Sequence, residues 1–218
     1  MHSEAHASLG WIIANAAPLD RRARNWCVLA SVVPDLDAVP IIFGIDQYAK
    51  WHHTFGHNIF FCFIFSALAA WHCHSMRSFW FILAAFASHL VTDAYFSGWC
   101  LYLFWPFSHW GYLPDWHVGL GHPLNLGFIY AGFLAAVFIA VLRKRTPLDI
   151  FSPKLDALVI SLFSKKKLAC HICGRGGNCR CAECHDPVCS RHASLQRNFN
   201  VLCPECRVKP AMKRGVAS

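Results

Sequence analysis

Charged side chains are scarce in this sequence of 218 residues: they make up 15%, whereas soluble domains contain about 25%. Hydrophobic residues make up 56%, and they include 18 Phe and 9 Trp. Aromatic residues of this kind are typical of membrane–water interfaces. The composition therefore favours a membrane protein over a soluble domain with a very apolar core.

Basic residues are also rare in residues 1–142, which hold five Lys or Arg against seven Asp or Glu, a formal charge of −2. Residues 143–218 hold fifteen against five, a formal +10. No basic segment precedes the first apolar run, so we expect no secretory signal. The sequence has no Gly-x-Ser-x-Gly motif, which argues against a serine hydrolase of the common α/β type. The chain changes character at Arg143-Lys144-Arg145.

Apolar runs predict an all-α fold, a polytopic bundle of membrane helices followed by a small C-terminal zinc-binding module. The helices are expected at residues 4–16, 26–33, 59–71, 79–95 and 124–142. The last segment has nineteen residues without a charge, close to the roughly 20 that a spanning helix needs. The basic residues that follow it predict a cytoplasmic end.

The segments between these helices are expected to be irregular. Arg21, Arg22 and Arg24 suggest a short basic turn, and residues 38–45 a loop or short helix. Residues 97–125, rich in Trp, Pro, Gly and His, predict a structured loop at a membrane interface.

His89 and Asp93 lie four residues apart within an apolar segment. This spacing places both side chains on one face of a helix, and ionisable groups in membrane helices usually face the bundle interior and carry function. A histidine and a carboxylate so placed can bind a divalent cation such as zinc. His89 and Asp93 therefore predict a metal site.

Further candidate ligands come from separate segments that a bundle could bring together: His6, Asp35, Asp37, His52 and His57. His53 is a weaker candidate. Singly, each has an ordinary alternative, such as a surface or capping role for His6, a turn or N-cap for Asp35, or an interfacial position for His52. Imidazole and carboxylate ligands together suit zinc, manganese or iron(II).

Such ligand sets are typical of helical hydrolases, in which the cation lowers the pKa of a bound water. We assign the catalytic part to Asp35, His57, His89 and Asp93. Asp37 is expected either to be a second carboxylate ligand or to orient a ligand histidine.

The same residues carry a family resemblance. The boxes, in order, are Glu4-Ala5-His6, Pro34-Asp35-Leu36-Asp37, His52-His53-Thr54-Phe55-Gly56-His57-Asn58, Ser88-His89-Leu90-Val91-Thr92-Asp93 and Leu103-Phe104-Trp105-Pro106-Phe107. Over residues 4–142 this order resembles the YdjM-like family of inner-membrane metal-dependent hydrolases. The resemblance implies a metal-dependent hydrolase in a bacterial inner membrane.

Two positions depart from the family pattern: His53 stands where Arg is usual, and Asn58 where Ser is usual. If that Arg binds an anionic substrate, its replacement affects the substrate class and not the metals. A looser resemblance to helical zinc phospholipase C, which shares the His-x-x-x-Asp pair, implies phosphodiester chemistry.

Eight of the twelve cysteines lie between Cys170 and Cys206. Four ligand pairs, each separated by two residues, predict two structural zinc sites. In an alternating cross-brace, one site takes Cys170, Cys173, Cys189 and His192, and the other takes Cys181, Cys184, Cys203 and Cys206. A sequential pairing stays open, as does Cys179 in place of Cys181. A module this short depends on its metals for folding, and thiolate sites indicate a reducing compartment.

We therefore expect a hydrolase domain at residues 1–145, a basic amphipathic linker at 146–169, a double zinc module at 170–207 and a tail at 208–218. The predicted protein is a multi-pass hydrolase of the bacterial inner membrane, with a cytoplasmic zinc module. Its substrate would be a lipid or small-molecule ester or phosphoester, and membrane lipid is an expected partner.

The alternative is a non-catalytic membrane adaptor whose zinc module recruits a protein partner. The positive charge of the second half suits a phosphate-rich partner or a membrane surface. Nucleic acid is less favoured, because the sequence shows no aromatic platform and no base-reading helix. A metal transporter would need ligands strung along a path through the bilayer.

Overall fold

The computed structural model describes residues 1–163, 169–177, 179–196 and 200–208. Contacts divide the chain into two compact units, Met1–Ile139 and Ala140–Ser218. The four-part division expected from the sequence stays a prediction. Its basic Lys165-Lys166-Lys167 segment and all of its tail after Val208 lie outside the described residues.

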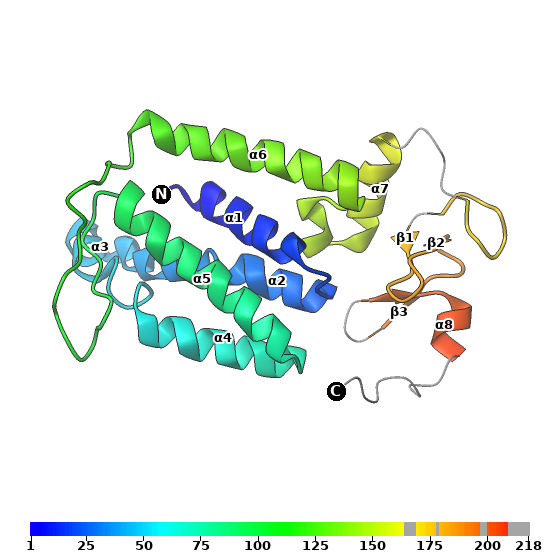
Figure 1. The fold of residues 1–218 in the computed structure, drawn as a ribbon, viewed down its shortest axis with the longest axis horizontal. Coiled ribbons are helices and arrows are strands. Elements are labelled where there is room, and N and C mark those ends of the chain that lie inside the picture. The colour runs from blue at the N-terminus through cyan, green and yellow to red at the C-terminus, as the bar shows by residue number, and fades with distance from the viewer. Residues whose placement is uncertain (164–168, 178, 197–199, 209–218) are drawn as a thin grey trace. The chain divides into compact units, whose positions relative to one another are not determined.

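The helices of the first unit are shown in Figure 1, and five of them overlap the predicted apolar runs. They are α1 (Ser3–Ala16), α2 (Arg21–Ala30), the 3-10 helix η1 (Val33–Phe43), α3 (Ile45–Trp51), α4 (Ile59–Cys73), α5 (Met76–Phe96) and α6 (Pro123–Arg143). Helices α1, α2, α4 and α5 pack against one another. Small side chains such as Ala14, Ala23, Ala30, Ala69 and Ala85 fill the core between them, so the helices approach one another closely.

The expected basic turn after α1 is wrong. Arg21, Arg22 and Arg24 form the start of α2. The reason is the preceding Asp20, whose carboxylate accepts a hydrogen bond from the Ala23 amide at 2.7 Å. This N-cap begins the helix at Arg21, five residues before the apolar run predicted from residue 26.

The segment at 38–45, expected as a loop or a short helix, belongs mostly to the 3-10 helix η1, which has Pro34 in its first turn and Gly44 as its C-cap. Proline is tolerated there because the first N–H groups of a helix have no internal partner. Gly44 has φ +116°, which a side chain would strain. The polar segment that follows is also partly helical, as α3.

Residues between α5 and α6 contain no helix, as predicted for this aromatic segment. Leu101 and Tyr112 form an antiparallel bridge with amide-to-carbonyl distances of 2.9 and 2.8 Å. The Leu103 carbonyl accepts from the Ile59 amide at 3.0 Å, and the His53 carbonyl accepts from the Tyr102 amide at 3.3 Å. The loop is thus tied to the segment around the start of α4.

Two helices in the described part of the chain, α5 and α6, are long and apolar enough to cross a membrane. Helices α2 and η1 pass the same test as a pair bent by 48°, which gives a third candidate span. Helix α6 leaves large apolar side chains such as Phe133, Leu134 and Phe138 more than 60% exposed. These features support a membrane protein with two or three spans.

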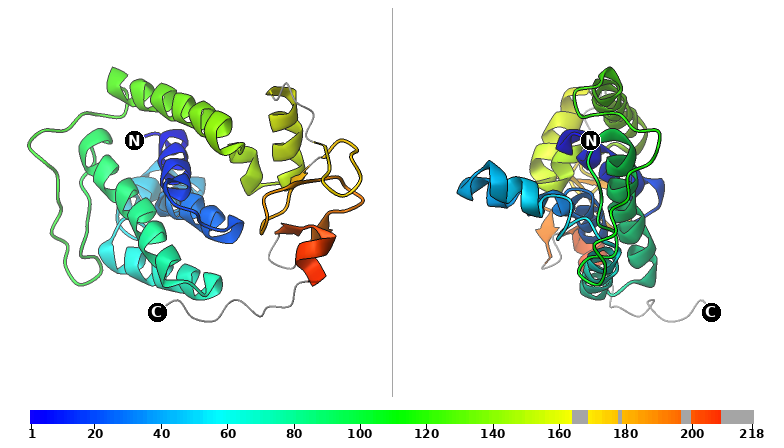
Figure 2. Two further views of the ribbon diagram at one scale, coloured as in Figure 1. Left: turned by 45° about the vertical axis from the view of Figure 1, so that its right-hand side comes forward. Right: turned by 90° about the vertical axis from the view of Figure 1, so that its left-hand side faces the viewer.

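The second unit corrects the all-α prediction. It contains η2 (Pro147–Ile150), α7 (Pro153–Phe163), the strands β1 (Cys179–Arg180), β2 (Pro187–Val188), β3 (Ser194–Leu195) and β4 (Val201–Leu202), and α8 (Pro204–Val208). Strands β1 and β2 pair antiparallel, as do β3 and β4. Figure 2 shows α8, in red, directly after the last strand. Cys181, Cys189 and Cys203 directly follow β1, β2 and β4, strands that helical periodicity did not predict.

Candidate metal centres

Four side chains from three segments of the first unit meet at one point. Each offers one ligand atom, and the four atoms lie within 4.8 Å of one another: Asp35, His57, His89 and Asp93. Asp35 comes from η1, His57 precedes α4, and His89 and Asp93 share α5. The two histidines are fully buried. Such a set is costly to bury unless its charges are compensated.

The hydrogen bonds of His57 and His89 show which of their ring nitrogens carry protons. Nδ1 of His89 lies 2.8 Å from the carbonyl oxygen of Ser31, which can only accept, so Nδ1 carries a proton. Nδ1 of His57 lies 2.8 Å from the Asp37 carboxylate in the same way. In neutral rings both Nε2 atoms then present lone pairs, yet these atoms are 3.0 Å apart.

A proton or a cation must therefore lie between the two imidazoles. Burial lowers the pKa of His57, but its hydrogen bonds with Asp37 and Asp93 outweigh burial and raise the pKa to about 9. A metal ion bound here would displace that proton. Two imidazole nitrogens and two carboxylates form a donor set that fits zinc, manganese or iron(II).

Asp37 orients histidines and lies outside the four-atom group. Its two carboxylate oxygens accept from Nδ1 of His52 and Nδ1 of His57, both at 2.8 Å. The Gly56 amide donates to it at 3.1 Å. Of the two roles expected for Asp37, the geometry therefore supports the orienting one. His52 is not one of the four converging residues; it shares this carboxylate with His57, and its ring also lies 5.6 Å from that of His57.

Gly56 permits this arrangement. A Cβ at this position would lie 2.2 Å from the carbonyl oxygen of Pro34. The backbone before His57 thus passes against the start of η1, which holds Asp35 and Asp37 beside His57.

His6 approaches the centre from α1 and is fully buried. Its Nε2 lies 2.9 Å from Oδ1 of Asp93, which also pairs with the Met1 amino group. Its ring stacks on that of His89 with 3.7 Å between centroids. His6 therefore contacts the outer oxygen of Asp93, and it is not one of the four converging atoms.

His53, a weaker candidate in the sequence, is buried beside Asp93. It is 1% exposed, and its Nε2 lies 3.3 Å from Oδ2 of Asp93. Burial lowers the pKa of His53 to about 4, only partly offset by Asp93, so the ring is neutral. His53 has φ +66°, and this left-handed backbone separates its direction from that of His52. Adjacent histidines give no periodic signal that could show which one faces inward.

Asp35 is where the centre opens. Its side chain is 23% exposed, against 2% or less for its three partners. Ser3 donates to its Oδ2 at 2.7 Å, and its Oδ1 lies 3.5 Å from Nε2 of His89. Of the four ligand residues, Asp35 is therefore the one that is partly exposed at the surface of the first unit.

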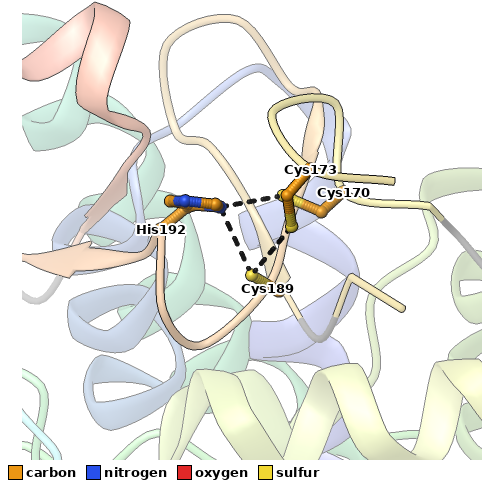
Figure 3. Close-up of side chains that lie close together, drawn as sticks. All are labelled: Cys170, Cys173, Cys189 and His192. Carbon is orange, nitrogen blue, oxygen red and sulfur yellow. Dashed lines mark hydrogen bonds between the residues drawn. The ribbon is translucent and has the colours of Figure 1, made fainter. Parts of the chain in front are cut away.

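The second unit holds two further clusters, and the cysteine pairs alternate between them. The first is shown in Figure 3 and consists of Cys170, Cys173, Cys189 and His192. Nδ1 of His192 lies 3.6 Å from Sγ of Cys170 and 3.5 Å from Sγ of Cys189. Burial raises the pKa of Cys170, but the backbone amides of Cys189 and Cys173 outweigh it and lower the pKa to about 5. The site thus favours a thiolate, the form that binds zinc.

The second cluster consists of Cys181, Cys184, Cys203 and Cys206. Sγ of Cys184 and Sγ of Cys203 are 3.9 Å apart, and the Cys203 amide donates to Sγ of Cys181 at 3.3 Å. Cys179 lies outside it, since its thiol donates to the Val188 carbonyl at 3.4 Å. The eight side chains therefore meet as in a cross-brace, and each set could hold one zinc ion.

The sequence pattern of the YdjM inner membrane protein family matches residues 1–167. The chain belongs to the YdjM family. The match covers every residue of the histidine–aspartate centre and ends before Cys170, so the YdjM likeness does not extend to the two cysteine clusters. No curated protein and no solved structure matches this YdjM chain.

Proposed function

We propose that this YdjM protein is a metal-dependent hydrolase of the bacterial inner membrane that acts on an ester or phosphoester. The observation that carries the proposal is the approach of the His57 and His89 Nε2 atoms to 3.0 Å beside two carboxylates. Buried ionisable groups in membrane helices are, in addition, usually functional.

The residues of the centre have different proposed roles. A divalent cation held by Asp35, His57, His89 and Asp93 would supply Lewis acidity and a nucleophilic water at neutral pH. Asp37 and the Ser31 carbonyl hold the Nδ1 protons of His57 and His89, and thereby keep both Nε2 atoms available as ligands. Asp35 lies at the open side and can accept a proton from incoming water.

The orientation that we propose in the membrane rests on the basic residues at the end of α6. Helix α6 ends at Arg143, and Lys144 and Arg145 follow it; basic residues at a helix end favour the cytoplasmic side. We therefore place the zinc clusters in the cytoplasm, where thiolates stay reduced. Their fully thiolate and imidazole ligand sets indicate structural zinc, so the module serves to bind a protein or a lipid surface, in preference to nucleic acid.

Hydrolysis of a panel of esters and phosphodiesters by the purified full-length protein tests the proposal. We expect turnover that a chelator abolishes and that His89→Ala lowers by at least about 100-fold, because removing a ligand should cost no less than removing the partner that orients one, about 10- to 100-fold. The matched control is His109→Ala, an exposed histidine in the loop after α5. Turnover that survives both the chelator and His89→Ala would remove the hydrolase assignment.

The second candidate is a membrane adaptor, favoured by the cross-braced clusters that lie beyond the YdjM match. Cys170→Ser separates the two functions, because Cys170 belongs to a zinc cluster only. A hydrolase should retain its turnover in this variant. An adaptor should lose its cellular effect in the variant, and neither the wild type nor the variant should then hydrolyse the test substrates.

A further inference from the structure

We infer that the groove between η1, α3 and the segment before α4 binds the alkyl chain of a phosphate-bearing amphiphile. This inference rests on the proposed function, because it names the substrate class of the same centre. It stands on three observations: the lining of the groove, its place beside the centre, and a single cation at its edge.

The groove has a volume of about 280 Å³ and is lined by Leu36, Asp37, Val39, Pro40, Trp51 and Phe55. This volume is near the lower end of ligand pockets, about 300 Å³. Asp37 is the only polar side chain in the lining, and the two imidazoles and the Gly56 amide already occupy its oxygens. The groove therefore offers an incoming group mainly apolar contact, which suits a hydrocarbon tail.

The groove adjoins the metal centre through the chain itself. Leu36 stands between Asp35 and Asp37 on η1, and Phe55 precedes His57 by two residues. Its floor, Asp37, is one imidazole ring away from the four ligand atoms, because it holds Nδ1 of His57 while Nε2 points to the centre. A tail in the groove brings its head group to the open side at Asp35.

The walls of the groove carry apolar side chains that are exposed at the surface of the first unit. Leu36 is 60% exposed, and Val39 and Phe55 are each 51% exposed. Further along, Ile42 and Phe43 are more than 70% exposed. Since η1 is part of the bent pair that passes the span test, these side chains fit a position in the hydrocarbon region. A lipid tail can then enter sideways from the bilayer without crossing water.

Lys50 marks the polar end. Its Nζ lies 5.2 Å from the ring centroid of Trp51, a wall of the groove. No other Lys or Arg occurs between Arg24 and Arg77. A lone cation beside the groove favours an anionic head group, and phosphate joins that charge to the phosphoester chemistry of the centre.

Photolabelling of the full-length protein in phosphatidylcholine vesicles tests the inference without requiring turnover. The probe is dodecyl phosphate with a diazirine at the end of its chain, and labelled peptides are mapped by mass spectrometry. We expect labelling concentrated at residues 36–40 and 51–55. Val39→Trp fills the groove and should lower this labelling about tenfold, as the loss of a few buried CH₂ groups requires.

The matched control is Ile42→Trp, which adds the same side chain to the same helix outside the lining and should leave labelling unchanged. Leu36→Trp serves as a second filling variant, and metal content reports folding of each. Lys50→Gln should weaken labelling by the phosphate probe and leave a neutral dodecanol probe unaffected. Labelling spread evenly over the exposed helices, or equal in Val39→Trp and Ile42→Trp, would overturn the inference.

His89→Ala separates this inference from the proposed function. The variant should lose its metal and its hydrolysis while retaining groove labelling, because His89 does not line the groove. If the wild type shows no hydrolysis but labels in the groove as described, the lipid site stands and the hydrolase assignment falls. If it hydrolyses esters without groove labelling, the reverse holds.

Discussion

Nε2 of His57 and Nε2 of His89 face each other at 3.0 Å, although the two residues are separated by 32 positions in the chain. Each ring is fixed from behind at Nδ1, His57 by Asp37 and His89 by the Ser31 carbonyl. With both Nδ1 protons engaged, the shared space between the rings must hold something positive. Asp35 and Asp93 border the same space and add two negative charges.

Asp37→Asn tests the orienting role. The amide keeps the size of the side chain, but it can no longer accept from both imidazole Nδ1 atoms with a full charge. We expect metal affinity in the first unit to fall about 10- to 100-fold, as for other partners of metal-bound histidines. Competition with a chelating dye measures it. The control is Asp46→Asn, an exposed carboxylate in the first turn of α3; equal affinity in both variants would contradict the role.

Gly10→Ala tests the packing that supports His89. A Cβ on Gly10 would lie 2.1 Å from Oγ of Ser31, and the Ser31 carbonyl is the partner of His89. We expect a loss of about 1–3 kcal/mol in the free energy of unfolding, the usual cost of overpacking, together with weaker metal binding. Gly127→Ala on α6, where nothing lies within 4 Å, should be neutral or stabilising in the same denaturant titration.

Acid should release the two zinc ions of the second unit in sequence. Zinc needs thiolates, so a cluster is lost as the pH falls through the range in which its thiols take up protons. Each cluster has a thiol with a raised pKa, Cys173 in the first and Cys184 in the second, so the difference between the clusters lies in the lowered ones: the pKa of Cys170 is lowered to about 5 and that of Cys181 only to about 7. The Cys181 cluster should therefore release zinc at the higher pH.

A zinc-binding dye follows this release during an acid titration. Cys184→Ser should remove the first step and leave the second, and Cys173→Ser should do the opposite. A single step common to both clusters would contradict the order.

Paired serine variants decide which thiol completes the second cluster. Cys181 is 1% exposed and lies with three other thiols, whereas the Cys179 thiol donates to the Val188 carbonyl. We expect Cys181→Ser to lower the zinc content by one ion per chain and Cys179→Ser to leave it unchanged. Loss of zinc in the Cys179 variant alone would exchange the two roles.

The sequence predicted what local spacing controls. The four-residue step from His89 to Asp93 is such a case, because one helix brings the two side chains to one face. Backbone conformation and long-range packing decided the rest. The inward direction of His53 depends on its positive φ. The orienting role of Asp37, as distinct from the ligand role of Asp35, became visible only through the hydrogen bonds that Asp37 accepts from two histidines.

The helices and strands were likewise predicted only where a local pattern determines them. The apolar runs predicted the long helices, but the Asp20 cap extended α2 over the arginines that were expected in a turn. The two-residue strands of the second unit are too short for a period-two pattern to emerge. Their ligand spacing was nevertheless visible, because pairs separated by two residues do not depend on the secondary structure around them.

The count and the ligands of the bound metals test the central claim most directly. Elemental analysis and X-ray absorption on the full-length protein should find two zinc ions with sulfur-rich ligand sets and at least one further cation with nitrogen and oxygen ligands. The double variant Asp35→Ala/His89→Ala should lose only the latter. Two sulfur-bound zinc ions per chain in both proteins, with no further metal in the wild type, would contradict the account.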